Sequence, residues 1–85
     1  MLVKVTEHET GPGPSEKIVA IKTADGDSVY VAVSARSVDG DGIEIGNVLV
    51  QEPKRSLIEL PRESIDGKWR IWVYNSDLIA PALVE

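Results

Sequence analysis

The chain has 85 residues, of which 42% are hydrophobic and 27% charged, and its net charge is −5. This composition is typical of one small globular domain, residues 1–85, and argues against a disordered chain. The absence of cysteine excludes disulfides, thiolate nucleophiles and cysteine zinc sites. No apolar run reaches bilayer length and the first residues do not resemble a signal peptide, so we expect a cytoplasmic protein without membrane contact.

The charge is unevenly distributed along the chain. Residues 1–52 carry four basic and nine acidic groups, whereas residues 53–85 carry five of each. An acidic chain repels the phosphates of nucleic acids, which disfavours general nucleic-acid binding. The electrically neutral second half still holds the basic residues that a local binding face requires.

The first half of the chain predicts strands joined by short turns, because β-branched residues dominate its apolar positions. Leu2–Thr6 alternates and is the first expected strand. Thr10–Ser15 contains two prolines and two glycines, which predicts a loop. Lys17–Thr23 and Val29–Val33 follow as strands, and the Asp-Gly turn between them makes this pair the clearest hairpin in the sequence.

The second half also predicts short strands joined by turns, and it begins with a turn region at residues 37–42. Two short strands should come next, at Ile43–Ile45 and Val48–Val50, with a β-bulge at the intervening Gly-Asn pair. The remaining expected elements are a short strand at Ser56–Leu60, one helical turn at Pro61–Ser64, a strand at Lys68–Tyr74, a short turn at Ser76–Pro81 and a few strand residues at Ala82–Glu85.

Five or six short strands at such spacing predict an all-β fold. At this length a small, strongly bent, five- to six-stranded antiparallel barrel fits better than a seven-stranded sandwich, because closure also removes exposed strand edges. The expected core residues are Val19, Ile21, Val29, Val31, Val33, Trp69, Ile71 and Val73.

Residues 72–81 read Trp-Val-Tyr-Asn-Ser-Asp-Leu-Ile-Ala-Pro. This run resembles the close of a Src-homology-type small barrel, in which a strand enters a short 3₁₀ turn and then a brief final strand. The rest of the chain is similar in strand order alone. Tyr74 stands where the polyproline-binding members have proline, and Asp77 roughly where they have tyrosine, so polyproline binding does not carry over. Bacterial relatives of this barrel bind cell-wall peptides, metals, nucleic acid or other proteins, so the resemblance implies a fold rather than a role.

The sequence indicates no enzyme, cofactor or metal site. The single histidine, His8, precedes a flexible loop, and we expect it to be a solvated residue at a strand end. No serine lies in a Gly-x-Ser-x-Gly turn, and no glycine-rich phosphate loop is present. Ser37, Asp39, Asp41 and Gly42 imitate the start of a calcium loop, but the twelfth position is valine where a bidentate glutamate is required. An Asp- and Gly-rich turn explains the same residues without a metal.

The expected functional feature is the outward face of the last clear strand. Alternation there places Lys68, Arg70, Trp72 and Tyr74 together, with Tyr30 joining them if its hairpin is adjacent. Exposed Trp, Tyr and Arg are the residue types of binding hot spots. We therefore expect a non-catalytic protein-interaction module or assembly subunit, with self-association as a further use of this face. Two alternatives remain open. The same residues could stack on single-stranded nucleic acid. Trp72 could instead be buried, either under the terminal turn of Leu78 and Ile79 or over the other end of the barrel.

Overall fold

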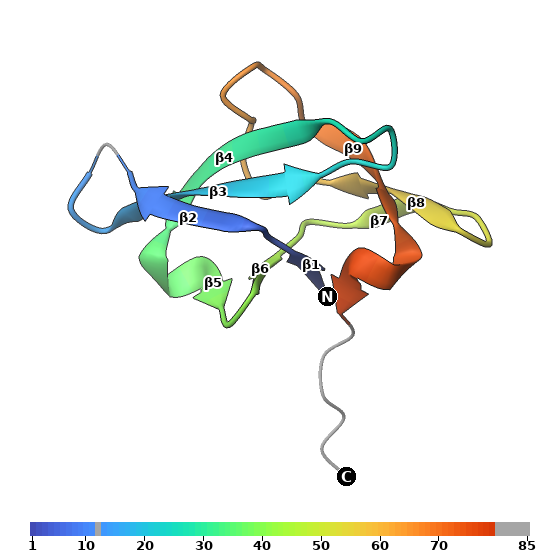
Figure 1. Cartoon of the computed structure of the whole chain (residues 1–85), viewed down its shortest axis with the longest axis horizontal. Helices are drawn as coiled ribbons and strands as arrows, with labels where there is room; N and C mark the ends of the chain where they lie inside the picture. The colour runs from blue at the N-terminus through green and yellow to red at the C-terminus, as the bar shows by residue number, and fades with distance from the viewer. Residues whose placement is uncertain (12, 80–85) are drawn as a thin grey trace, which may run out of the picture.

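The structure is a computed structural model that describes residues 1–11 and 13–79, except for the side chains of Glu7 and His8. Strands and two 3₁₀ turns make up its regular structure (Figure 1). The elements are β1 (Leu2–Lys4), β2 (Glu7–Thr10), β3 (Glu16–Lys22), β4 (Ser28–Ser34), η1 (Ala35–Ser37), β5 (Val38–Asp39), β6 (Gly42–Glu44), β7 (Val48–Gln51), β8 (Arg55–Glu59), β9 (Arg70–Tyr74), η2 (Asn75–Asp77) and β10 (Leu78–Ile79). The all-β expectation is thereby confirmed.

The strands form three antiparallel sheets, in the orders β10-β1-β6-β5, β2-β3-β4 and β7-β8-β9. No closed barrel is seen in the part of the chain that the structure describes, because no strand pairing joins these sheets into one ladder. Isolated backbone hydrogen bonds link them instead. Thr6 N donates to Ala20 O, and Ala24 N donates to Trp72 O.

The β3–β4 hairpin forms as expected, with Val19 opposite Val31 and Ile21 opposite Val29. Its turn has Gly26 at a φ of +93°, a conformation that only glycine adopts without strain. β2 was not expected to pair as a strand, because its sequence Glu-His-Glu-Thr has no apolar alternation. Pairing with β3 holds β2 in the sheet, since its four residues include no apolar side chain that could be buried.

Two local expectations in the second half were wrong. The Gly46-Asn47 pair carries no bulge but separates β6 from β7, which lie in different sheets, and the register shift occurs between Val48 and Val50. Pro61–Ser64 does not form a helical turn, since residues 61 and 62 form a bend and residues 63 and 64 have no regular structure. Ser64 is held instead by a backbone hydrogen bond from its N–H to Lys68 O, which closes a non-helical loop. Pro81 and the expected strand residues at 82–85 lie outside the described residues.

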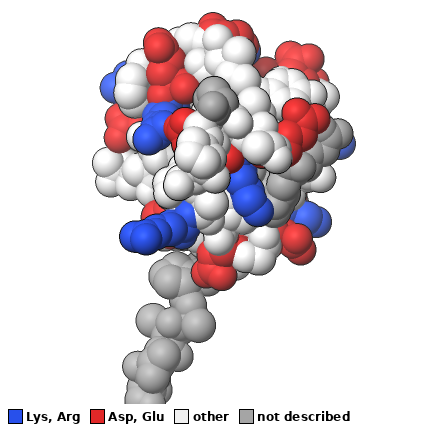
Figure 2. Space-filling model, turned by 90° about the vertical axis from the view of Figure 1, so that its left-hand side faces the viewer, with Lys and Arg blue, Asp and Glu red and all other residues white. Residues whose placement is uncertain are grey.

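None of the charged side chains that the structure describes is buried. Figure 2 shows basic and acidic groups interspersed on the face it presents, rather than gathered by sign. Within the stretches 1–11 and 13–79, no helix has the length and apolar character needed to cross a membrane.

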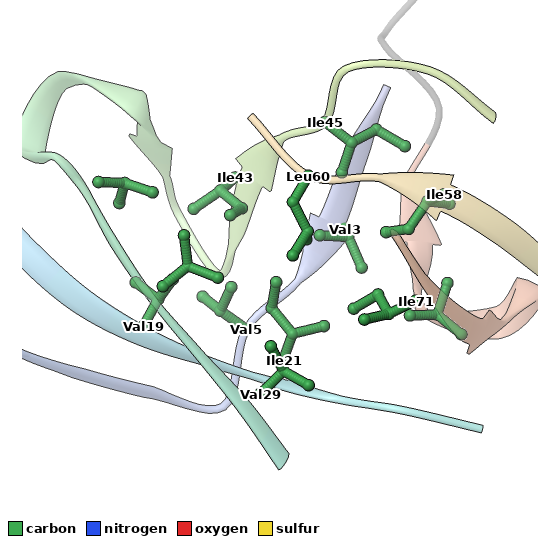
Figure 3. Packing of buried hydrophobic residues seen from close by; sticks show 13 residues of the cluster. Val3, Val5, Val19, Ile21, Val29, Ile43, Ile45, Ile58, Leu60 and Ile71 are labelled. Atoms are coloured by element: carbon green, nitrogen blue, oxygen red, sulfur yellow. The ribbon is translucent and has the colours of Figure 1, made fainter. Parts of the chain in front are cut away.

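The core lies between the sheets, where side chains from β1, β3, β4, β6, β8 and β9 converge (Figure 3). Its buried members are Val3, Val5, Val19, Ile21, Val29, Val31, Val33, Ile43, Ile45, Ile58, Leu60, Ile71 and Val73. One expected core residue is absent from it: Trp69 is 53% exposed. The reason is its position, since β9 begins at Arg70 and Trp69 lies before the strand, outside the alternation that buries Ile71 and Val73.

Candidate functional site

The sheet β7-β8-β9 has one face in the core and one face toward solvent. Ser56 and Ile58 of β8 and Ile71 and Val73 of β9 are buried. Because side chains alternate along a strand, the residues between them point outward. We define the outer face as Val50, Arg55, Leu57, Glu59, Arg70, Trp72 and Tyr74.

Strand register arranges the outer face in three rows. The central row is apolar, because Leu57 lies opposite both Val50 and Trp72. Arg55 lies opposite Tyr74 on one side of this row, and Glu59 lies opposite Arg70 on the other. The result is an apolar and aromatic strip flanked by charged groups, the composition of many protein-binding surfaces.

Trp72 is partly buried, and an arginine lies over its ring. The Arg55 guanidinium carbon lies 4.3 Å from the centroid of the Trp72 ring, in a cation–π contact. Arg55 Nε also donates to Glu52 Oε1 at 2.9 Å, which fixes the guanidinium over the ring. The guanidinium therefore stacks on the indole, and part of the indole surface remains accessible.

An open groove of about 440 Å³ extends the face past Tyr74. It is lined by Glu52, Pro53, Lys54, Arg55 and Tyr74. Asn75 stabilises this end of the sheet, because its Nδ2 donates to Glu52 O at 2.7 Å and its backbone N to Lys54 O at 2.9 Å. These two hydrogen bonds connect the β7–β8 turn to η2 and so stabilise the residues that line the groove.

The expected site residues do not all come together. Arg70, Trp72 and Tyr74 share the outer face, as the alternation predicts. Lys68 lies before β9 in the 61–69 loop, where its Nζ is 3.7 Å from Asp66 Oδ2, and it lines one hollow together with Arg70 and Trp72. Tyr30 lies on β4 in a different sheet, and its carbonyl oxygen accepts from Ile65 N.

Sequence reasoning missed Val50, Arg55 and Leu57 as parts of the face. Their own alternation was visible in the sequence, but only the cross-strand register places them beside Trp72. It also missed Trp69, which lies exposed beside Arg70 and Glu59 in a second hollow.

A third hollow separates the β3–β4 turn from β9. Its charged lining consists of Asp25 and Asp27 on the turn, with Lys68 and Arg70 opposite. Thr23 lies at its base, where the Oγ1 atom is buried and has no hydrogen-bond partner among the described residues. The hollow therefore carries charged groups of both signs beside the apolar side chains of Ile71 and Trp72.

Comparison with protein-family models, with curated proteins and with solved structures finds no match to this chain. What the outer face could bind is therefore inferred from its own residues. Among the residues that the structure describes, no three His, Asp or Glu side chains gather as a metal site would require. The turn at residues 37–42 forms the end of η1 and the β5–β6 connection, with Gly40 at a φ of +60°.

Proposed function

We propose that the protein is a small, non-catalytic interaction module or assembly subunit that binds a protein partner through the outer face of β7-β8-β9. The observation that carries this proposal is the apolar row of Val50, Leu57 and Trp72, with Tyr74 45% exposed beside it. Aromatic side chains that are already ordered lose little conformational entropy on binding, which favours affinity. The Arg55 contact with Trp72 supplies that order.

A protein partner is favoured over single-stranded nucleic acid by the charges on the face. Glu59 and Glu52 lie beside the two arginines that a phosphate backbone would have to approach. Arg55 is already engaged by Glu52, so less of its charge is available to a phosphate.

We also propose that the chain is a Src-homology-type small barrel in an open form, working in the cytoplasm. Support for the fold comes from the succession at the end of the described chain, where β9 runs directly into the 3₁₀ turn η2 and then into the short strand β10. That succession is the one on which the resemblance rests.

The test compares two tyrosines of nearly equal exposure on different sheets. Tyr74 is 45% exposed on the outer face, and Tyr30 is 44% exposed on β4. After a partner has been captured with the wild-type chain and purified, Tyr74→Ala should weaken its binding by about tenfold or more. Tyr30→Ala should change binding by less than about twofold, since single contacts outside an interface contribute little.

The same experiment separates the protein from the nucleic-acid interpretation. Capture that disappears after nuclease treatment, with affinity falling steeply as salt rises, would replace the proposal by nucleic-acid binding. Equal losses from Tyr74→Ala and Tyr30→Ala would instead refute the assignment of the outer face.

A further inference from the structure

The edge strand β7 is unusually apolar and exposed for so small a protein. Its sequence is Val-Leu-Val-Gln, and all four residues are exposed, with Val48 at 36%, Leu49 at 41% and Val50 at 43%. Within the described chain, β7 pairs with β8 alone, on one of its two sides. An apolar edge of this kind is a template for pairing with another strand.

The backbone groups on the open side of β7 can be identified from the ladder. Glu52 N donates to Arg55 O, so Arg55 and Leu57 of β8 direct their backbone groups toward β7. Gln51, opposite Ser56, therefore turns its N–H and C=O away from β8, and so does Val48, opposite Ile58. No backbone hydrogen bond links β7 to any other described element.

Three other edges in the described chain are covered or charged. At the far edge of the same sheet, Trp72 O accepts from Ala24 N. At the edge of β4, Tyr30 O accepts from Ile65 N. The β2 edge has glutamate at two of its four positions, which discourages strand pairing. β7 has none of these protections, although it does contain a β-bulge between Val48 and Val50.

The bulge makes the open edge complementary to itself. Val48 and Gln51 are three residues apart, yet both lie opposite buried residues, Ile58 and Ser56. Both side chains therefore lie on the inner side of the sheet, which a regular strand does not allow at that spacing. A two-fold axis perpendicular to the sheet would set Val48 opposite Gln51 of a second copy, with matching sides and matching backbone groups.

Charge favours the same arrangement. Residues 46–79 carry five basic and five acidic groups, so copies that approach through this region avoid the repulsion of the acidic first half. No charged residue lies within Val48–Gln51 itself. We propose that the occupant of the β7 edge is a second copy of this chain, which adds its β7 antiparallel and gives a six-stranded sheet with both outer faces on one side.

The first experiment measures mass by analytical ultracentrifugation between about 1 µM and about 1 mM, the range in which small interfaces dissociate. We expect a monomer–dimer equilibrium. Gln51→Pro removes an N–H that faces the open edge and leaves the β8 ladder intact, so it should yield a folded monomer. The matched variant Gln51→Ala should dimerise as the wild type does. A wild-type monomer throughout this range would overturn the proposal.

The register is tested with cysteines, since the chain has none of its own. Opposed residues of a hydrogen-bonded pair lie about 5.5 Å apart at Cα, within reach of a disulfide. A mixture of Val48→Cys and Gln51→Cys chains should cross-link on oxidation, and either variant alone should cross-link far less. Equal cross-linking in all three samples would contradict the two-fold register.

The dimer is independent of the proposed partner binding, and the two can fail separately. Tyr74→Ala should dimerise normally, because Tyr74 lies on β9 at the opposite side of the sheet from the β7 edge. If Tyr74→Ala abolished dimerisation, then the outer face rather than the edge would be the self-association surface.

Discussion

Ser64 organises the loop between β8 and β9 through hydrogen bonds in both directions. It is only 5% exposed, its Oγ donates to Asp66 Oδ1, and the same Oγ accepts from Lys68 N at 2.8 Å. The bond from Ser64 holds the pKa of Asp66 below its ordinary value of 3.8, and nearby Lys68 acts in the same direction. One small buried side chain thus fixes the approach of the chain to β9.

The lowered pKa of Asp66 predicts how this loop responds to acid. The carboxylate favours the folded state above pH 3.8, and its contribution is lost as the pH falls through the folded-state pKa. Urea unfolding of the wild type and of Asp66→Asn should therefore differ by a constant amount above about pH 5 and converge in more acidic solution. A difference that grows below pH 3.8 would contradict the assignment.

Individual elements differ in how far the sequence predicts them. The β3–β4 hairpin was predictable because valines alternate on both sides of an Asp-Gly turn. The shared orientation of Arg70, Trp72 and Tyr74 was predictable for the same reason. The neighbours of Trp72 were not, since Leu57 and Val50 reach it only through cross-strand register, and Tyr30 requires knowledge of how separate sheets are arranged.

The two tryptophans should respond differently to truncation. Trp72 loses its stacking on Arg55 and its contact with the sheet, so Trp72→Ala should lower the free energy of unfolding by about 1–2 kcal/mol. Trp69 is 53% exposed, and Trp69→Ala should cost less than about 0.5 kcal/mol. Chemical denaturation of both variants measures the difference. A larger loss of unfolding free energy from Trp69→Ala would mean that Trp69 is packed in the core.

At the scale of the whole molecule, composition and alternation predicted the all-β class. Every residue that they placed in the core is buried there except Trp69. The division into three sheets was beyond such reasoning. It depends on which short strands pair across long stretches of chain, and several of these strands have only two or three residues. Segments that short carry too little periodicity to identify a partner.

Because the sheets share one core, truncating a single buried side chain should lower the free energy of unfolding substantially. Val31 is fully buried opposite Val19, and Val31→Ala should lower the free energy of unfolding by about 1–3 kcal/mol through lost burial and cavity formation. Ser28→Ala, at the exposed start of the same strand, should change it by less than about 0.5 kcal/mol. Comparable effects from both would mean that β4 does not face the core as described.

The position of β1 has a consequence for folding during synthesis. β1 lies between β6 and β10, and Leu2 pairs with both Glu44 and Ile79. The β3–β4 hairpin pairs neighbouring residues and can form as soon as it leaves the ribosome. β1 must wait for β10, so the pairing between these two strands is completed only when Ile79 has emerged. Until then, the edge of β1 that β10 later covers is open to other chains.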